Sequence, residues 1–203
     1  MRDTIAAAPD YERLYALAAT QAGYFTARTA KHAGYGWALL SHHARTGLLR
    51  RVSRGVYRIR DYPSSPHEEL VAVQIAFGPR AFISHESALD VLELSDVIPD
   101  SIHVTVPRWR RSRPSPPGVT MHTVTRPLAP DEVALRGSLR VTSPARTIAD
   151  VSAAGLAPDV VGQAVREAIS RGLATPATLR RAAAERSQRV RDDIERAITV
   201  SRR

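Results

Sequence analysis

The chain has 203 residues, of which 43% are hydrophobic and 24% are charged, a composition typical of a globular protein with its own core. It has no run of about 18 apolar residues and no cysteine, which excludes membrane-spanning helices, disulfides, thiolate metal sites and thiol catalysis. The N-terminus lacks the apolar stretch of a signal peptide, so we expect a cytoplasmic protein.

The net charge of +9 is concentrated in the first third of the chain. Between Glu12 and Asp61 the sequence holds nine basic residues and no acid, whereas basic and acidic residues are equal in number over the remainder. A solvated surface normally mixes both signs, so this stretch indicates an anionic partner, either nucleic acid or a membrane surface. Because the stretch lacks the long amphipathic stripe of membrane-binding helices, we favour nucleic acid.

Two helices are predicted between residues 11 and 33. Residues 11–22 carry leucine and alanine at helical spacing, and Gly23 suits the left-handed position just past a helix. Thr26 can cap a second, shorter helix that we expect to continue to Ala33. Two glycines then allow a sharp turn before the next element.

A third helix is predicted from Trp37 to Thr46. Its apolar side consists of Trp37, Leu40 and Ala44. Its polar side consists of Ser41, His42 and Arg45. Arginine can bind guanine in a bidentate way, and serine or histidine can contact a phosphate or a base edge, so this side is a candidate for DNA recognition.

The stretch GLLRRVSRGVYRIRDY, residues 47–62, predicts a β-hairpin. Its two β-prone arms flank Ser53-Arg54-Gly55, a tight-turn signal. In the second arm two apolar residues alternate with Arg58 and Arg60, so we expect one face to pack while the other points cations into solvent. The candidate phosphate contacts on this hairpin are Arg50, Arg51, Arg54 and Arg58.

Three short helices followed by a two-stranded hairpin indicate a winged helix-turn-helix over residues 11–62, after a flexible N-terminus at residues 1–10. In this arrangement the third helix enters the major groove of double-stranded DNA, and the hairpin contacts neighbouring backbone. A solvated hairpin without a partner is the alternative, which the missing acids disfavour. The candidate DNA-binding residues are Arg28, Ser41, His42, Arg45, Arg50, Arg51, Arg54 and Arg58.

The second part of the chain, residues 66–203, is predicted to be an α+β domain. Prolines and serines near residues 61–66 mark the boundary before it. The predicted helices are 66–77, 85–94, 144–154, 158–170, 176–185 and 188–200. The predicted strands are 101–107, 118–124 and 139–143. The fold class is therefore α+β, with an N-terminal winged helix-turn-helix.

A second basic segment, residues 107–118, carries a tryptophan among arginines. It is either an exposed loop or a contact surface for another protein or nucleic acid, since tryptophan and arginine are enriched at binding hot spots. The candidate partner-binding residues are Arg108, Trp109, Arg110 and Arg111. Further along, the motif TSPARTIAD suggests either a phosphate-binding helix start or, preferably, a buried turn in which Arg146 pairs with Asp150.

Signals for catalysis or metal binding are weak. The sequence has no phosphate-binding loop, protein-kinase motif set, serine nucleophile elbow or zinc-protease motif, so we assign no catalytic residue, cofactor or metal. Adjacent histidines on a helix point about 100° apart, so His42 and His43 should be one polar and one half-buried residue. A structural role is also favoured over a metal site for His67, Glu68, Glu69, His85, Glu86, Asp90 and Asp100.

Several runs of residues together resemble the AbiEi family of antitoxins and transcriptional regulators. They are GYFTARTAKHAGYGWALLSHHARTGLLRRVSRGVYRIRDYPSSPHEEL, SHESAL, LSDVIPDSIHVTVP and VTSPARTIADV, and the resemblance covers most of residues 11–175. It implies an antitoxin that counteracts a nucleotidyltransferase-like toxin and represses its own operon at inverted repeats. We expect two protomers to pair on the two half-sites, with no membrane partner.

Two alternatives to this function stay open. A plain winged-helix transcription factor without a toxin would have the same DNA-binding module, and the neighbouring gene would separate the two. An enzyme that inactivates the toxin covalently, for example by phosphorylation, would act through a site that carries none of the familiar motifs. Incubating the toxin with ATP and weighing it would expose such an enzyme.

Overall fold

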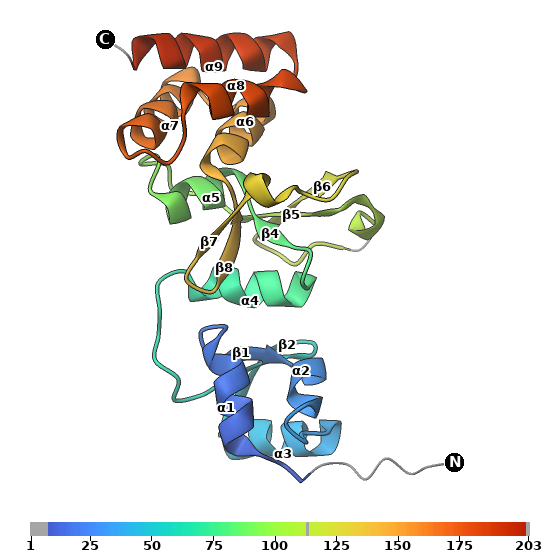
Figure 1. The fold of residues 1–203 in the computed structure, drawn as a ribbon. Coiled ribbons are helices and arrows are strands. Elements are labelled where there is room, and N and C mark those ends of the chain that lie inside the picture. Colours follow the sequence, from blue (N-terminus) through green and yellow to red (C-terminus); the bar gives the residue numbers. More distant parts are fainter. Residues whose placement is uncertain (1–7, 113, 202–203) are drawn as a thin grey trace. The chain divides into compact units, whose positions relative to one another are not determined.

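The computed structural model describes residues 8–112 and 114–201 and confirms the predicted α+β fold (Figure 1). The chain divides into two compact units, unit 1 (residues 1–79) and unit 2 (residues 80–203). None of the helices in the described ranges combines the length and the hydropathy that a membrane span requires.

Unit 1 begins with helix α1 (Tyr11–Ala19), as predicted. Asp10 caps this helix, since its carboxylate accepts a hydrogen bond from the Arg13 backbone N–H at 2.9 Å. Asp10 also donates its own N–H to the Ala33 carbonyl at 3.0 Å. The last residue of the segment expected to be flexible is therefore fixed, whereas residues 1–7 lie outside the described ranges.

Helices α2 (Ala27–Lys31) and α3 (Trp37–Thr46) form the helix-turn-helix pair. Thr26 caps α2 as predicted, because its hydroxyl accepts a hydrogen bond from the Thr29 backbone N–H at 3.0 Å. Helix α3 ends where Gly47 adopts a φ of 91°, a left-handed conformation that glycine takes without steric cost.

A three-stranded antiparallel sheet completes the winged arrangement of unit 1. Strands β2 (Leu49–Ser53) and β3 (Val56–Ile59) form the predicted hairpin. Strand β1 (Tyr24–Thr26) pairs with the other edge of β3, which gives the order β1-β3-β2. Strand β1 is three residues long, too short for its alternation to be recognised in the sequence.

The core of unit 1 lies between the helices and one face of this sheet. It contains Leu14, Ala18, Phe25, Ala30, Ala33, Tyr35, Leu40, Leu49, Tyr57 and Ile59. Between α1 and β1 the chain passes close to Tyr62, since a Cβ added at Gly23 would stand 2.4 Å from Tyr62 Cγ. The φ of Gly23 is +82°, so both space and backbone conformation require glycine there.

Helix α4 (Glu68–Phe77) belongs to unit 1, because it packs on β1 and β3. The boundary between the units therefore lies between Pro79 and Arg80, whereas the sequence suggested a second domain from residue 66. The prolines and serines at 61–66 connect two elements of the same unit. A proline-rich stretch breaks regular structure in either case, so the sequence does not distinguish a loop from a domain boundary.

Unit 2 contains a five-stranded mixed sheet with the order β6-β5-β4-β8-β7. Its strands are β4 (Phe82–Ile83), β5 (Ile102–Pro107), β6 (Val119–Val124), β7 (Val133–Arg136) and β8 (Leu139–Thr142). The pairs β5–β6 and β4–β8 are parallel, and the pairs β4–β5 and β7–β8 are antiparallel. The predicted strands β5, β6 and β8 are confirmed, whereas β4 is two residues long and β7 lacks a regular alternation, so neither was predicted.

The helices predicted after residue 80 are all present in unit 2. They are α5 (His85–Leu92), α6 (Pro144–Ala154), α7 (Pro158–Ser170), α8 (Pro176–Ala184) and α9 (Gln188–Val200). Helix α5 packs against β5 and α6, and helices α6 to α9 pack on one another beside the sheet (Figure 1). Because α5 follows β4 and α6 follows β8, both helices begin at the carboxyl ends of two parallel strands.

Candidate nucleic-acid interface and a buried polar cluster

Helix α3 exposes the polar side that the sequence predicts. His42 and Arg45 are exposed, and Ser41 is half-buried. Trp37 is 74% exposed, which corrects its assignment to the apolar side, while Leu40 is buried as expected. Trp37 is the first residue of the helix, and side chains lean toward the helix N-terminus, so its ring projects past the end of the core.

The edge strand β2 adds cations to this surface. Arg50 and Arg51 are exposed, and Arg54 is exposed in the turn that follows. In the register of the sheet Arg51 pairs with Tyr57, a core residue, so Arg51 lies on the face against which the helices pack. Arg50 pairs with Arg58 on the opposite face. Arg51 therefore shares a face with α3, whereas Arg50 does not.

Arg58 is buried, which corrects its assignment to DNA binding. Its guanidinium donates hydrogen bonds to the Tyr62 and Pro63 carbonyls at 3.0 and 3.1 Å and pairs with Glu68 at 3.0 Å. It also lies 5.4 Å from the centre of the Tyr24 ring. The alternation in the hairpin implied a free outer face, but β1 occupies the second edge of β3 and α4 packs on it.

Arg28 lies on α2 beside the turn of the wing. Ala27 donates its backbone N–H to the Gly55 carbonyl at 2.9 Å, and Arg28, the next residue, is exposed. Helix α3 packs against β2, so both helices adjoin the wing, α3 at its strand β2 and α2 at its turn. Four exposed cations of this surface form no ion pair within the described part of the chain, and we call them the interface arginines: Arg28, Arg45, Arg51 and Arg54.

The adjacent histidines of α3 have the predicted difference in burial. His42 is exposed, whereas His43 is half-buried and its ring centre lies 5.8 Å from that of Tyr35. Burial, with a smaller contribution from His42, lowers the pKa of His43. Neither residue belongs to a group of three metal-binding side chains among the described residues.

The second basic segment forms an exposed turn in unit 2. It contains the 3-10 helix η1 (Arg108–Arg110), in which Trp109 is 61% exposed. The Arg110 guanidinium lies 5.3 Å from the centre of the Trp109 ring, and Arg108 and Arg111 are exposed. Arg113 lies outside the described ranges. An accessible surface at these four candidate residues is thus present, and its role as a partner site stays a prediction.

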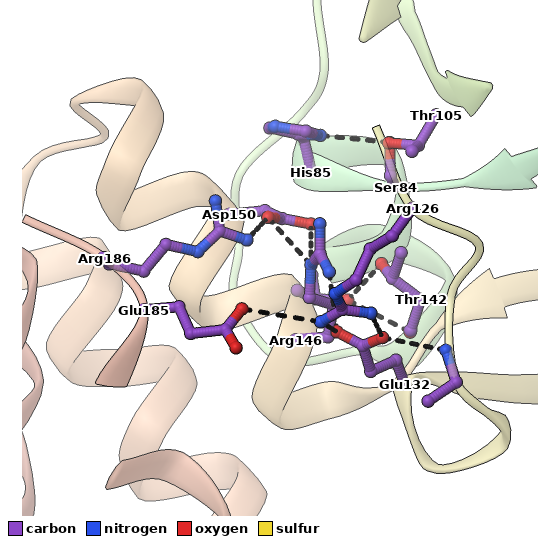
Figure 2. Close-up of polar contacts among 12 residues, drawn as sticks. Ser84, His85, Thr105, Arg126, Glu132, Thr142, Arg146, Asp150, Glu185 and Arg186 are labelled. Atoms are coloured by element: carbon purple, nitrogen blue, oxygen red, sulfur yellow. Dashed lines mark hydrogen bonds and ion pairs between the residues drawn. The ribbon is translucent and has the colours of Figure 1, made fainter. Parts of the chain in front are cut away.

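Arg146 and Asp150 form the predicted pair, at the centre of a larger buried network in unit 2 (Figure 2). Arg146 donates to Asp150 at 2.8 and 3.0 Å and to Glu132 at 2.7 Å. Arg186 donates to Asp150 Oδ1, which also accepts from Arg146, and Arg126 binds Glu132 through two hydrogen bonds of 2.5 and 3.0 Å. The network joins α6 to the 3-10 helix η2 (Pro130–Glu132) and to the chain after α8.

Both central members of this network are charged at neutral pH. Burial by itself would raise the pKa of Glu132, but hydrogen bonds from Arg126, the Ala129 N–H and Arg146 lower that pKa to about 2. Burial would lower the pKa of Arg146, but the charges and hydrogen bonds of Asp150 and Glu132 raise it. The network therefore consists of ion pairs rather than neutral hydrogen bonds.

A cavity of about 810 Å³ opens beside the network. Its wall includes His85, His122, Arg126, Arg146, Asp150 and Arg186. The first turn of α6 also lines it, but Ser143 makes no side-chain cap to that helix. Because the arginines in the wall are paired with carboxylates, the structure favours the buried turn over a free phosphate-binding helix start.

Three histidines meet at the edge of this cavity. His85 begins α5, His103 lies on β5 and His122 on β6, and one nitrogen of each lies within 4.8 Å of the other two. His103 Nδ1 and His122 Nε2 are 3.1 Å apart, and the rings of His85 and His122 stack with their centres 3.4 Å apart. Burial is the main cause that lowers the pKa of all three, that of His85 to about 2.

Sequence reasoning missed this histidine cluster, because its members follow no metal-motif spacing and only the sheet brings them together. It grouped His85 with nearby carboxylates instead. None of those carboxylates belongs to a cluster of three potential metal ligands among the described residues. Glu68, for example, pairs with Arg58 in unit 1. The sequence could have indicated this cluster only if the pairing of β5 with β6 had been known beforehand.

Unit 1 has the element order and the antiparallel sheet expected of a winged helix-turn-helix. Residues 12–60 match the family described as "Transcriptional regulator, AbiEi antitoxin", which confirms the predicted resemblance over these residues. The solved structure of the RV2827C protein from Mycobacterium tuberculosis has a similar fold, with a TM-score of 0.59 and 14% identity over 93% of this chain and 75% of that chain. No curated protein matches the chain.

Proposed function

We propose that the protein is an antitoxin that counteracts a nucleotidyltransferase-like toxin and represses its own operon by binding DNA through unit 1. The observation that carries the DNA-binding part is the set of four interface arginines on α2, α3 and the wing, which are exposed and form no ion pair with an acid of the described ranges. The match of residues 12–60 to the AbiEi family description supports the regulatory and antitoxin roles.

In this proposal the exposed side of α3 lies in the major groove of an operator half-site. Arg45 and His42 then reach base edges or phosphates, and the exposed Trp37 ring packs against the sugar or a thymine methyl group. Arg51 and Arg54 hold the adjacent backbone from the wing, and Arg28 adds a contact beside the turn. Two protomers on inverted half-sites would block transcription.

Unit 2 is assigned to the toxin or to pairing of protomers. Eight of its sixteen described arginines pair with carboxylates of the same unit, so fewer of its cations are left for DNA than its arginine content suggests. The exposed Trp109 and its flanking arginines offer a surface that a protein partner could bury.

A titration of the full chain against its own upstream DNA at several salt concentrations tests DNA binding. We expect log K to fall with log salt by about 0.9 for each phosphate neutralised, hence by about 4 for the four interface arginines of one protomer. The variant R51A/R54A should bind roughly 10- to 100-fold more weakly and lower this slope by about 2. The matched control is R180A/R181A, which removes the same charge from exposed positions of unit 2.

Equal losses in the two double variants would overturn the assignment of DNA binding to unit 1. The toxin assignment is tested separately by growth rescue in cells that express the neighbouring gene. R51A/R54A should still rescue growth, because the interface arginines are not used against the toxin. A toxin whose mass increases after incubation with this protein and ATP would favour covalent inactivation over neutralisation by contact.

A further inference from the structure

The histidine cluster of unit 2 has no part in the proposed DNA binding, and its composition is that of a metal site. Imidazole nitrogen is a preferred ligand of Zn²⁺, and three histidines with one open position are a common set for zinc sites that bind a further ligand. We propose that His85, His103 and His122 bind one Zn²⁺ ion, whose open position faces the cavity of unit 2.

The spacing of His103 and His122 supports this assignment. Their ring nitrogens are 3.1 Å apart, and two nitrogen ligands of one tetrahedral zinc ion lie about 3.3 Å apart, given Zn–N bonds of about 2.05 Å. The parallel register pairs Thr105 with His122, so His103 and His122 lie on the same face of the sheet, displaced by two residues. The strands thus fix the backbone positions of both residues, and only the rings, which are now stacked at an angle of 24°, have to turn about their side-chain bonds to direct both nitrogens at one ion.

His85 is held beside this pair by its backbone and by a hydroxyl chain. Its φ is +51°, a left-handed conformation that is uncommon outside glycine and is often kept at functional positions. Its Nδ1 lies 3.0 Å from Ser84 Oγ, which in turn accepts a hydrogen bond from Thr105 at 2.8 Å (Figure 2). These contacts engage Nδ1 and leave Nε2 of His85 for the ion, as outer hydrogen bonds do in metal sites. The ring is now stacked on that of His122 at an angle of 13°, so it has to turn about its side-chain bonds when the ion binds.

The charges around the cluster also fit a bound cation. None of the three histidines forms an ion pair with a described carboxylate, and their ring nitrogens contact Ser84 and one another. The arginines nearest the cavity are neutralised by Glu132 and Asp150. These ion pairs weaken the repulsion that Arg146 and Arg186 exert on a cation at the cluster.

The position of the cluster explains why the ion would keep an open side. His85 and His122 line the cavity of about 810 Å³, whereas His103 does not. An ion held by the three rings is thus accessible to water or a small anion from the cavity. This inference concerns unit 2 alone and does not rest on the proposed DNA binding.

Metal analysis of the full chain after chelator treatment and dialysis against Zn²⁺ tests the proposal. We expect one zinc per chain, and at least a 100-fold weaker affinity in H122A and in H103N, which keeps a polar side chain in case the alanine variant unfolds. The control is H42A/H43A, which removes two histidines from α3 and should bind zinc as the wild type does. Circular dichroism would verify that each variant is folded.

Cobalt substitution tests the open position. The Co²⁺-loaded protein should have visible absorption that changes when azide is added, because azide would bind from the cavity. Less than half an equivalent of zinc in the wild type, or unchanged affinity in folded H122A and H103N, would overturn the metal site and leave a hydrogen-bonded histidine cluster. A Co²⁺ spectrum that azide does not change would overturn the open position.

Discussion

In unit 1 the interface arginines are exposed and form no ion pair within the described residues, whereas in unit 2 eight of the sixteen described arginines bind carboxylates of the same unit. Arg146 is the extreme case, since it is buried and contacts both Asp150 and Glu132. The same residue type therefore stabilises one unit and is left available for a partner in the other.

This difference shows that arginine content alone does not indicate a binding surface. Arg58 demonstrates the point within unit 1, because it belongs to the acid-free stretch of the sequence and yet pairs with Glu68, which follows that stretch. What distinguishes an interface arginine is exposure without an acidic neighbour in space. Four substitutions or conditions would break or sharpen the comparison.

The largest effect is expected from D150A in unit 2. Asp150 is 4% exposed and pairs with both Arg146 and Arg186, so its removal leaves buried cationic groups without their counter-charge. Loss of one partner of a buried ion pair costs about 3 to 5 kcal/mol, and we expect unfolding of unit 2 by urea at a correspondingly lower concentration. DNA binding by unit 1 should be retained. If D150A also lost DNA binding, the ion pairs of unit 2 would not be separate from the DNA-binding function of unit 1.

Acid should weaken unit 2 through Glu132. The pKa of Glu132 is about 2 in the folded protein, whereas its ordinary value is 4.5, so the folded state binds the proton less tightly than the unfolded state does. The stabilisation is fully present above pH about 4.5 and is lost as the pH falls toward 2, by at most about 3 kcal/mol. Urea unfolding between pH 6 and 3 measures this loss. E132Q should be less stable at pH 6 and less sensitive to acid, and an unchanged sensitivity would contradict the assignment.

The variants R58A and R45A should separate the two kinds of arginine within unit 1. R58A removes the ion pair with Glu68 and two hydrogen bonds to carbonyls, and we expect it to destabilise unit 1 by about 2 kcal/mol. R45A should leave the free energy of unfolding within about 0.5 kcal/mol and weaken DNA binding instead. Thermal unfolding and the DNA titration measure the two effects, and a reversed result would restore Arg58 to the interface.

The smallest effect is expected from W37A. The Trp37 ring is 74% exposed, so its removal should change the free energy of unfolding by less than about 0.5 kcal/mol. Loss of its apolar contact with DNA should weaken binding by about 1 kcal/mol, roughly fivefold. W109A, which removes the other exposed tryptophan, serves as the control and should leave DNA binding unchanged. If W37A lowered the stability of unit 1, the Trp37 ring would have to be part of the core.

Much of the fold could be predicted because its signals are local. Helical spacing and caps located α1 to α9 apart from shifts at their ends, and Thr26 makes the cap that its position implies. Strands β5, β6 and β8 alternate or carry β-prone residues over four or more positions. Strands β1 and β4 could not be found, since two or three residues hold no periodic pattern and pair only because their neighbours in space provide an edge.

The candidate site was predictable only in part, for the same reason. The sequence by itself determined where the cations are, which turns glycine must occupy and that Arg146 can reach Asp150 one helical turn away. Tertiary structure alone decided that Arg58 is buried, that Trp37 is exposed and that His85, His103 and His122 meet. Burial and contact between distant residues depend on which elements pack together, and no local pattern of side chains specifies that packing.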